Sequence, residues 1–148
     1  MTALLQRVSR SCVRVEGELV GEIGTGLNVL LGIMKDDTEA DVALLVPKIL
    51  NLRIFEDSAG KMNRSLLDTN GELLIISQFT LAGNIKKGRR PSFDGAMPPA
   101  RAKALYEHFI ATCKAQVHTV HSGVFGAMMD VEIHNDGPVT IIADSKHL

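Results

Sequence analysis

The sequence has few cysteines and no long hydrophobic run. Its two cysteines, Cys12 and Cys113, lie far apart and form neither a CxxC pair nor a zinc-ligand spacing. This pattern predicts no disulfide framework and favours a reducing cytoplasm. No apolar run is long enough to cross a bilayer, and the N-terminal MTALLQRVSR is interrupted by Gln6 and Arg7 too early for a signal peptide. We therefore expect a cytoplasmic protein without a membrane segment.

An excess of charge is also lacking, since 16 Lys and Arg residues stand against 17 Asp and Glu residues, for a formal net charge of −1. A global positive field of the kind that attracts nucleic acids is therefore excluded, although a local basic patch is not. The length of 148 residues fits one domain with a real hydrophobic core. Because no repeat, linker or low-complexity tract interrupts the chain, we expect a single domain over residues 1–148.

The motifs of several common enzyme classes are missing. The sequence contains no GxSxG, HExxH, P-loop or GxGxxG. His118 and His121 are three residues apart, so on a strand they would point to opposite faces and make a poor metal pair. Cys113 falls on the predicted buried face of a helix, which favours a core residue over a nucleophile. We expect no metal and no cofactor.

Hydrophobic periodicity predicts a sheet. Residues 3–8 form a first strand, and residues 12–24 alternate apolar and polar positions around a Glu16-Gly17 hairpin signal. More buried strands are expected at residues 27–33 and 72–83, and two further strands at 128–133 and 139–143. Residues 57–71 are polar and rich in turn formers.

Two helices are expected beside the sheet. The first is capped by Asp37 or Thr38, contains Pro47 as a source of a kink or a lost hydrogen bond, and buries Val42, Leu45, Val46 and Ile49. The second opens with Pro98 and Pro99 and buries Ala102, Leu105, Tyr106, Phe109 and Cys113. About six or seven strands and two helices, without regular alternation, predict a mixed α+β fold.

Polar residues follow the apolar run at residues 72–76, in the stretch SQFTLAG. If the strand continues, Gln78 and Thr80 share one face while Ser77 and Phe79 share the other. Polar side chains and free amides at the end of a buried strand suit a small pocket. An ordinary strand exit, with hydroxyls bonded to neighbouring backbone, is the alternative. Thr80 has no adjacent base, so a catalytic triad is not supported.

A basic cluster lies a few residues further on, in KKGRRPSF. Lys86, Lys87, Arg89 and Arg90 fall within five residues of a predicted loop. Such a run is either a solvated loop or a patch that contacts phosphates, and its closeness to the candidate pocket favours considering the second.

The stretch NDGPVTI places Gly137 and Pro138 at the mouth of a predicted strand. Proline offers no N–H to a sheet, and glycine has no side chain to pack. A tight turn between strands is one explanation. The other is a site built from main-chain atoms, in which a cis Gly-Pro bond presents rigid carbonyl acceptors to an ammonium group.

Together these stretches resemble the D-aminoacyl-tRNA deacylases of the widespread dimeric type, formerly called D-tyrosyl-tRNA deacylases. The matching segments run in order along almost the whole chain: LLQRV, GEIGTGLNVLLGI, RIFEDSAGKMN, SQFTLAG, GRRPSF, RAKALYEHF and NDGPVTI. SQFTL and NDGPVT are the two signature motifs of that family. Asn28, where members more often carry leucine, and the polar tail DSKHL depart from the pattern without touching either motif.

The resemblance implies a carboxylic ester hydrolase that needs no cofactor and acts on the aminoacylated 3′ end of tRNA. It would release a free D-amino acid and reusable tRNA, and achiral glycyl-tRNA, such as glycine mischarged on tRNA(Ala), would be a further substrate. The implied fold is a mixed α+β, barrel-like domain that forms a homodimer with its active sites at the interface.

The resemblance also assigns residues. A cis Gly137–Pro138 would reach into the partner's site and reject L-substrates by steric clash, with Met129 holding that loop in place. Ser77, Gln78, Phe79 and Thr80 would line the opposite wall. Backbone amides near Phe79 and Thr80 would stabilise the oxyanion, and a 2′-hydroxyl of the terminal adenosine would help activate water.

Two other functions remain open from the residues alone. The first is a non-catalytic, dimeric RNA-binding module in which the Gly-Pro pair is only a turn. The second is a general hydrolase of small esters, which requires a nucleophile that this sequence does not offer.

Overall fold

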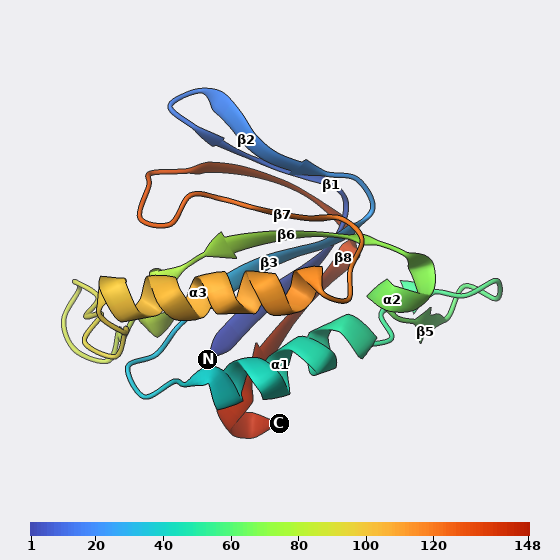
Figure 1. The fold of residues 1–148 in the computed structure, drawn as a ribbon. Helices are drawn as coiled ribbons and strands as arrows, with labels where there is room; N and C mark the ends of the chain where they lie inside the picture. Colours follow the sequence, from blue (N-terminus) through green and yellow to red (C-terminus); the bar gives the residue numbers. More distant parts are fainter.

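A curled six-stranded sheet with two long helices on one face forms the body of the protein, which a computed structural model describes from Met1 to Leu148 (Figure 1). The strand order is β2-β1-β3-β6-β7, and β8 pairs with the other edge of β1. The strands are β1 (Thr2–Val15), β2 (Glu18–Ile23), β3 (Gly26–Gly32), β6 (Glu72–Ser77), β7 (Val120–Ser122) and β8 (Asp130–Asp144). The mixed α+β, barrel-like fold expected from the sequence is confirmed.

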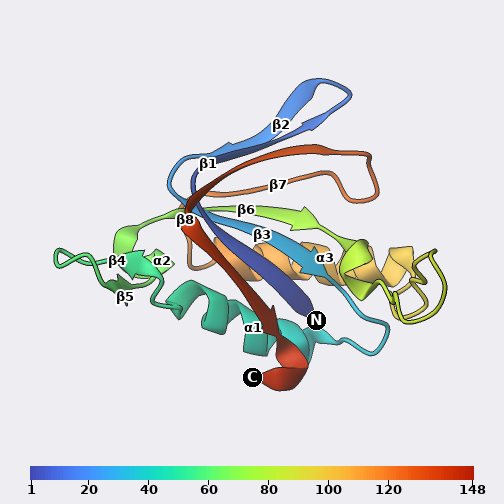
Figure 2. The ribbon, with the colours of Figure 1, turned by 180° about the vertical axis from the view of Figure 1, so that it is seen from behind.

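Strand β1 organises this sheet. One of its edges pairs with β3 from Thr2 to Val8 and then with β2 from Ser11 to Val15, while β8 follows the opposite edge. The predicted hairpin between β1 and β2 is confirmed, since Glu16 and Gly17 have φ of 51° and 81°. The sheet then curls over itself (Figure 2), and at Gly21 of β2 an added Cβ would lie 3.1 Å from the carbonyl oxygen of Ser122 in β7.

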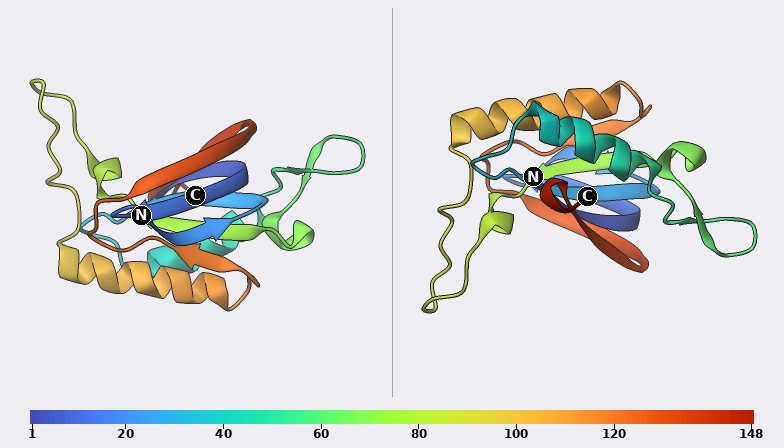
Figure 3. Two further views of the ribbon diagram at one scale, coloured as in Figure 1. Left: turned by 90° about the horizontal axis from the view of Figure 1, so that it is seen from above. Right: turned by 90° about the horizontal axis from the view of Figure 1, so that it is seen from below.

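The two long helices, α1 (Glu39–Asn51) and α3 (Pro99–Lys114), connect parallel strands and cover the same face of the sheet (Figures 1 and 3). The four apolar residues predicted to face inward from α1 are buried, and so are those of α3 except Leu105, which is partly exposed. Thr38 is the N-cap of α1 and forms a capping box with Asp41. Cys113 lies in the core, where burial raises the pKa of its thiol to about 12. None of the helices combines the length and the apolar character needed to span a membrane.

The polar segment at residues 57–71, expected only to form turns, contains the strand β5 (Met62–Arg64) and the helix α2 (Leu66–Thr69). Strand β5 pairs with β4 (Phe55–Glu56), which lies directly before the segment. The expectation of two helices was therefore incomplete. Asp57 stabilises the β4–β5 turn by accepting the N–H groups of Ala59 and Lys61 at 2.9 and 3.0 Å. Ser65 and Asp68 form a capping box for α2. This Ser-x-x-Asp spacing is a helix-start signal that the expectation of turns overlooked.

The final strand is another correction. Two strands separated by the Gly-Pro pair were expected, but β8 is one strand that pairs with β1 on both sides of the pair. The register shifts between Gln6 and Val8 of β1, so the extra residues of β8 are absorbed as a bulge rather than as a turn.

A smaller apolar cluster fills the other side of the sheet, and Asn28 of β3 is a buried polar residue of the sheet. Its side chain is fully buried, and its Nδ2 has no hydrogen-bond partner. The Ser11 hydroxyl lies 3.2 Å from Asn28 Oδ1 but also 2.8 Å from the carbonyl oxygen of Glu132. Ser11 therefore keeps an acceptor without Asn28, whereas the Asn28 amide donor carries a desolvation cost.

Replacing Asn28 with leucine, which has nearly the same shape, is therefore expected to raise the free energy of unfolding by about 1 kcal/mol. Asn28→Ala also removes the unpaired donor but leaves a cavity, so it should give a less stable protein than the leucine variant. Urea unfolding of the three proteins measures the difference. An Asn28→Leu protein less stable than the parent would contradict this account.

Candidate functional site

The candidate site begins where β6 ends. Ser77, the last residue of β6, pairs with Leu31 of β3, and the Gln78 N–H donates to the carbonyl oxygen of Leu31 at 2.8 Å. The chain then turns into a 3₁₀ helix, η1 (Phe79–Ala82), in which the Leu81 N–H donates to the carbonyl oxygen of Gln78. The expected alternation of side chains along one strand is therefore wrong after Ser77, because β3 ends at Gly32 and offers no further strand to pair with.

A cavity of about 440 Å³ opens beside this turn. One wall comes from the end of β6 and from η1, and the other from the segment that leads into α3. No lining residue is ionisable: Leu31, Ile33, Ser77, Gln78, Phe79, Phe93, Ala96, Met97, Pro98, Pro99, Ala102, Phe125 and Gly126. The cavity is thus mainly apolar, and its polar groups are the Ser77 hydroxyl, the Gln78 amide and main-chain atoms.

Two main-chain amides at the start of η1 are available to a ligand. The first N–H groups of a helix have no partner within it. Among the hydrogen bonds of turns, loops and side chains, none uses the N–H of Phe79 or Thr80. The Thr80 hydroxyl lies against Nε2 of Gln78, and no His, Asp, Glu or Lys hydrogen-bonds to it. The geometry therefore offers backbone donors but no activated side-chain nucleophile.

Aromatic side chains stand at the edge of this cavity. Phe79 is 60% exposed and meets Phe93 edge-on, with ring centroids 5.2 Å apart and an interplanar angle of 69°. Such an exposed apolar pair beside a cavity favours contact with a flat or apolar ligand group.

The predicted basic cluster lies on a loop between these two phenylalanines. Asn84 and Ser92 close the loop through two backbone hydrogen bonds of 2.7 and 3.0 Å. The four basic residues (Lys86, Lys87, Arg89 and Arg90) are exposed, and none of them forms an ion pair. The loop extends from the same end of the molecule as η1, opposite the β4–β5 hairpin (Figure 3). Its charge is therefore free to meet an anionic partner next to the cavity.

The Gly137–Pro138 peptide bond is cis, and both residues are exposed. Arg7 of β1, expected only to interrupt the N-terminal apolar run, fixes the backbone beside them. Its Nε donates to the carbonyl oxygen of Asp136 at 3.0 Å, and its Nη1 donates to that of Ile54 at 2.8 Å. The Arg7 side chain is only 7% exposed. A charged residue within the apolar first strand was the signal in the sequence, because a buried charge requires partners.

The Gly-Pro pair does not reach the cavity of its own chain. Ser77 pairs with Leu31 of β3, Leu31 pairs with Ala3 of β1, and Ala3 pairs with Ala143 of β8. Ala143 is therefore the residue of β8 at the level of Ser77. Gly137 precedes Ala143 by six residues, which corresponds to about 20 Å along the strand at 3.3 Å per residue. Within its own chain, Met129, predicted to hold the Gly-Pro loop, has its sulfur 2.5 Å from where a Cβ of Gly123 would lie. Its contact with the Gly-Pro pair of another subunit stays a prediction.

No group of three or more His, Cys, Asp or Glu side chains converges in a way that could hold a metal ion. The cavity likewise presents no charged residue to a cofactor.

A family model and curated relatives both match this chain over almost its whole length. The model of a family described as D-Tyr-tRNA(Tyr) deacylase matches residues 4–144. Curated relatives named D-aminoacyl-tRNA deacylase include one from Persephonella marina, 60% identical over the full length of both chains. Another, from Clostridium kluyveri, is 58% identical over 100% of this chain and 99% of its own.

Solved structures share the fold. One described as c-Myc DNA Unwinding Element Binding Protein has a TM-score of 0.93 at 44% identity, covering 97% of this chain and 98% of its own. One described as a probable eukaryotic D-amino acid tRNA deacylase has a TM-score of 0.85 at 21% identity, covering 97% and 99%.

Proposed function

The chain belongs to the D-Tyr-tRNA(Tyr) deacylase family, and on that premise we propose that it hydrolyses the ester bond of D-aminoacyl-tRNA. The products are a free D-amino acid and reusable tRNA. Besides family membership, the observation that carries this proposal is an apolar cavity with free backbone amides and no ionisable lining residue. An aminoacyl ester is labile already, so stabilising developing charge is enough to speed its hydrolysis. We place the reaction in the cytoplasm, where tRNA is charged and used.

In the proposed mechanism, water attacks the ester carbonyl and the amides of Phe79 and Thr80 donate to the oxygen that becomes negatively charged. Backbone donors that are fixed before the reaction need no reorganisation in the transition state. A 2′-hydroxyl of the terminal adenosine helps to activate the water, which accounts for a reaction without a side-chain base in the cavity. The bond between the carbonyl carbon and the tRNA oxygen then breaks, and that oxygen takes the proton that the attacking water has lost.

Selection for the D-configuration comes, in this proposal, from Gly137 and Pro138 of a second copy of the chain. Their carbonyl oxygens orient the α-ammonium of the substrate, so that a D-side chain points out of the pocket and an L-side chain meets the Gly-Pro backbone. Rejection by a clash of this kind discriminates more strongly than a preference for one side chain. The exposure of both residues, far from their own cavity, supports an action across subunits.

An apolar row on the sheet face opposite the helices supports the proposed homodimer. Leu30, Leu4 and Ile142 are direct cross-strand neighbours on β3, β1 and β8. Ile142 is 70% exposed, and Leu4 and Leu30 are partly exposed. An apolar row left open on the chain suits burial against an identical row.

Paired deacylation assays test the proposal. D-Tyr-tRNA is expected to be hydrolysed at an enzyme concentration at which L-Tyr-tRNA survives. Glycyl-tRNA, including tRNA(Ala) mischarged with glycine, should also be cleaved, because glycine has no side chain to clash. Equal hydrolysis of the D- and L-substrates would refute chiral selection, and tRNA binding without cleavage would favour a non-catalytic RNA-binding module.

The basic loop is expected to bind tRNA phosphates. Changing Lys86, Lys87, Arg89 and Arg90 to glutamine should weaken tRNA binding and lower the slope of log Kd against log salt by about 3. The control is a double variant in which Lys48 and Arg53, exposed basic residues away from the loop, are changed to glutamine. It should have little effect on tRNA binding or on the salt slope. Filter binding between about 50 and 200 mM salt measures the affinity and the slope of each protein. An unchanged slope would mean that the loop is only solvated.

A further inference from the structure

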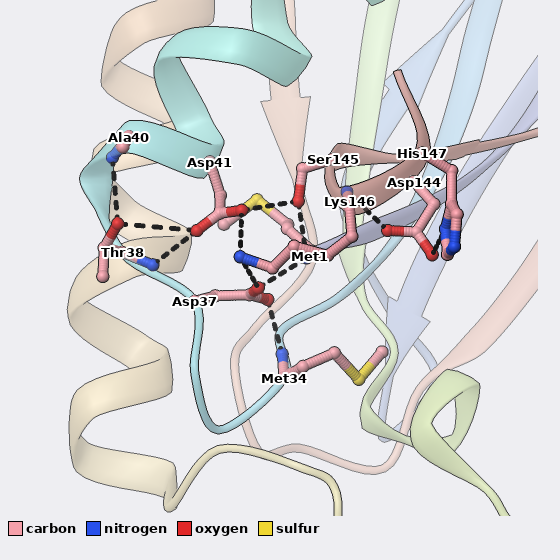
Figure 4. Close-up of polar contacts among 10 residues, drawn as sticks. All are labelled: Met1, Met34, Asp37, Thr38, Ala40, Asp41, Asp144, Ser145, Lys146 and His147. Carbon is pink, nitrogen blue, oxygen red and sulfur yellow. Dashed lines mark hydrogen bonds and ion pairs between the residues drawn. The ribbon is translucent and has the colours of Figure 1, made fainter.

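The α-ammonium of Met1 is buried at the side of the sheet, beside the start of α1 (Figure 4). It lies 2.6 Å from Oδ1 of Asp37 and 2.9 Å from Oγ of Ser145. The side chains of the ion pair are fully buried. The Ser145 hydroxyl in turn donates a hydrogen bond to Oδ1 of Asp41 at 2.6 Å.

Asp37 joins this ammonium to the loop between β3 and α1. Its other oxygen, Oδ2, accepts the N–H of Met34 at 2.6 Å (Figure 4). One carboxylate therefore ties the first residue of the chain to a loop more than thirty residues away, and both of its oxygens are used.

The same loop holds one wall of the cavity. The Lys35 N–H donates to the carbonyl oxygen of Gly95 at 2.9 Å, and the Met97 N–H donates to that of Ile33 at 3.0 Å. Ile33 and Met97 themselves line the cavity. A continuous chain of hydrogen bonds thus runs from the Met1 ammonium through Asp37 to the wall opposite Phe79.

We propose that the ion pair between the Met1 nitrogen and the carboxylate of Asp37 forms a clamp that positions the Ala96–Met97 wall of the cavity. The inference rests on the proposed function only for its effect on substrate binding. Both groups are buried, so removing the charge of one leaves the other without its partner, which is the costly way to break a buried pair.

The surrounding charges do not replace this ammonium. Lys146 is 3.7 Å from Asp37 Oδ1, but its side chain is 52% exposed and lies closer to Asp41, at 2.8 Å. Burial raises the pKa of Asp41, but hydrogen bonds from Lys146, Ser145 and Thr38 outweigh it and hold that pKa below its usual range. Asp41 therefore stays ionised and adds a second negative charge facing the amine.

Asp37→Asn, which keeps the shape and removes the charge, tests the clamp. The matched control is Asp57→Asn, since Asp57 also accepts loop N–H groups but stands in the β4–β5 hairpin. Amide hydrogen exchange, measured without substrate, is expected to show about 100-fold faster exchange at Lys35 and Met97 in Asp37→Asn only. The Leu73 N–H, bonded to the carbonyl oxygen of Thr119 at the other end of β6, serves as internal reference and should be unchanged.

Kinetics give an independent result. With D-Tyr-tRNA, KM is expected to rise about tenfold in Asp37→Asn while kcat stays within about twofold, because the displaced wall binds substrate and the Phe79 and Thr80 amides lie on the other wall. Unchanged exchange at Lys35 and Met97, or equal loss at Leu73, would overturn the clamp. Faster local exchange in a protein that cleaves no D-aminoacyl-tRNA would instead uphold the clamp and refute the proposed function.

Discussion

Phe79→Pro is expected to lower kcat for D-aminoacyl-tRNA hydrolysis by about 100-fold relative to Phe79→Ala. Both substitutions remove the aromatic ring, but only proline removes the N–H proposed to bind the oxyanion. Proline is tolerated at the first position of a helix, and Gln78 before it has φ −139° and ψ 77°, outside the helical region that a following proline disfavours. Comparing the two variants therefore isolates one backbone hydrogen bond.

Single-turnover deacylation of D-Tyr-tRNA measures this ratio, with thermal unfolding as a check that both variants fold. Thr80→Ala, which keeps the backbone amide and loses the hydroxyl, should retain most of the parent activity. Equal kcat values for Phe79→Pro and Phe79→Ala would remove the Phe79 amide from the mechanism. A loss of several orders of magnitude in Thr80→Ala would point to the hydroxyl as a nucleophile or proton carrier.

Arg7→Ala is expected to reduce the ratio of D- to L-Tyr-tRNA hydrolysis by at least about tenfold, since a 1.4 kcal/mol change in discrimination already corresponds to that factor. Arg7 binds the carbonyl oxygen of Asp136, and its Nη2 lies 3.2 Å from where a Cβ of Gly137 would be. Without it, the Gly-Pro backbone loses the group that fixes its position, and steric rejection requires a fixed wall.

The same substitution should lower the free energy of unfolding by about 3 kcal/mol, because the carbonyl oxygens of Asp136 and Ile54 lose a charged donor. Arg53→Ala is the matched control, since Arg53 is exposed and bonds only to the side chain of Asn63. Arg7→Lys should recover little selectivity, because a lysine cannot span two carbonyl oxygens with a planar fork. Parent-like selectivity in a folded Arg7→Ala protein would separate Arg7 from substrate discrimination.

Regular elements with strong periodicity were predictable because they depend on local pattern. Local spacing of apolar residues predicts the buried faces of α1 and α3 and the apolar strands β3 and β6. The hairpin at Glu16-Gly17 likewise follows from its own turn residues. Cys113 belongs to the core for the same reason, as one position on an apolar helix face.

Predictions were wrong or incomplete where pairing partners decide the conformation. SQFTLAG has the composition of a strand, yet it turns after Ser77 because β3 ends at Gly32. The NDGP part of NDGPVTI has the composition of a turn, yet it lies within β8 because β1 pairs with β8 on both sides of it. Neither outcome is visible in the segment itself, since the deciding residues are distant in the sequence.

By itself, the sequence determined the class of fold, the buried faces of the elements and, through its two signature stretches, the family. Only the tertiary structure decided that the Gly-Pro pair and the Phe79 turn of one chain lie apart, that Arg7 fixes the former, and that Met1 and Asp37 support the wall facing the latter. The physical reason is that side-chain period follows from local geometry, whereas the partners of a buried arginine, carboxylate or ammonium are set by which distant segments the folded sheet brings together.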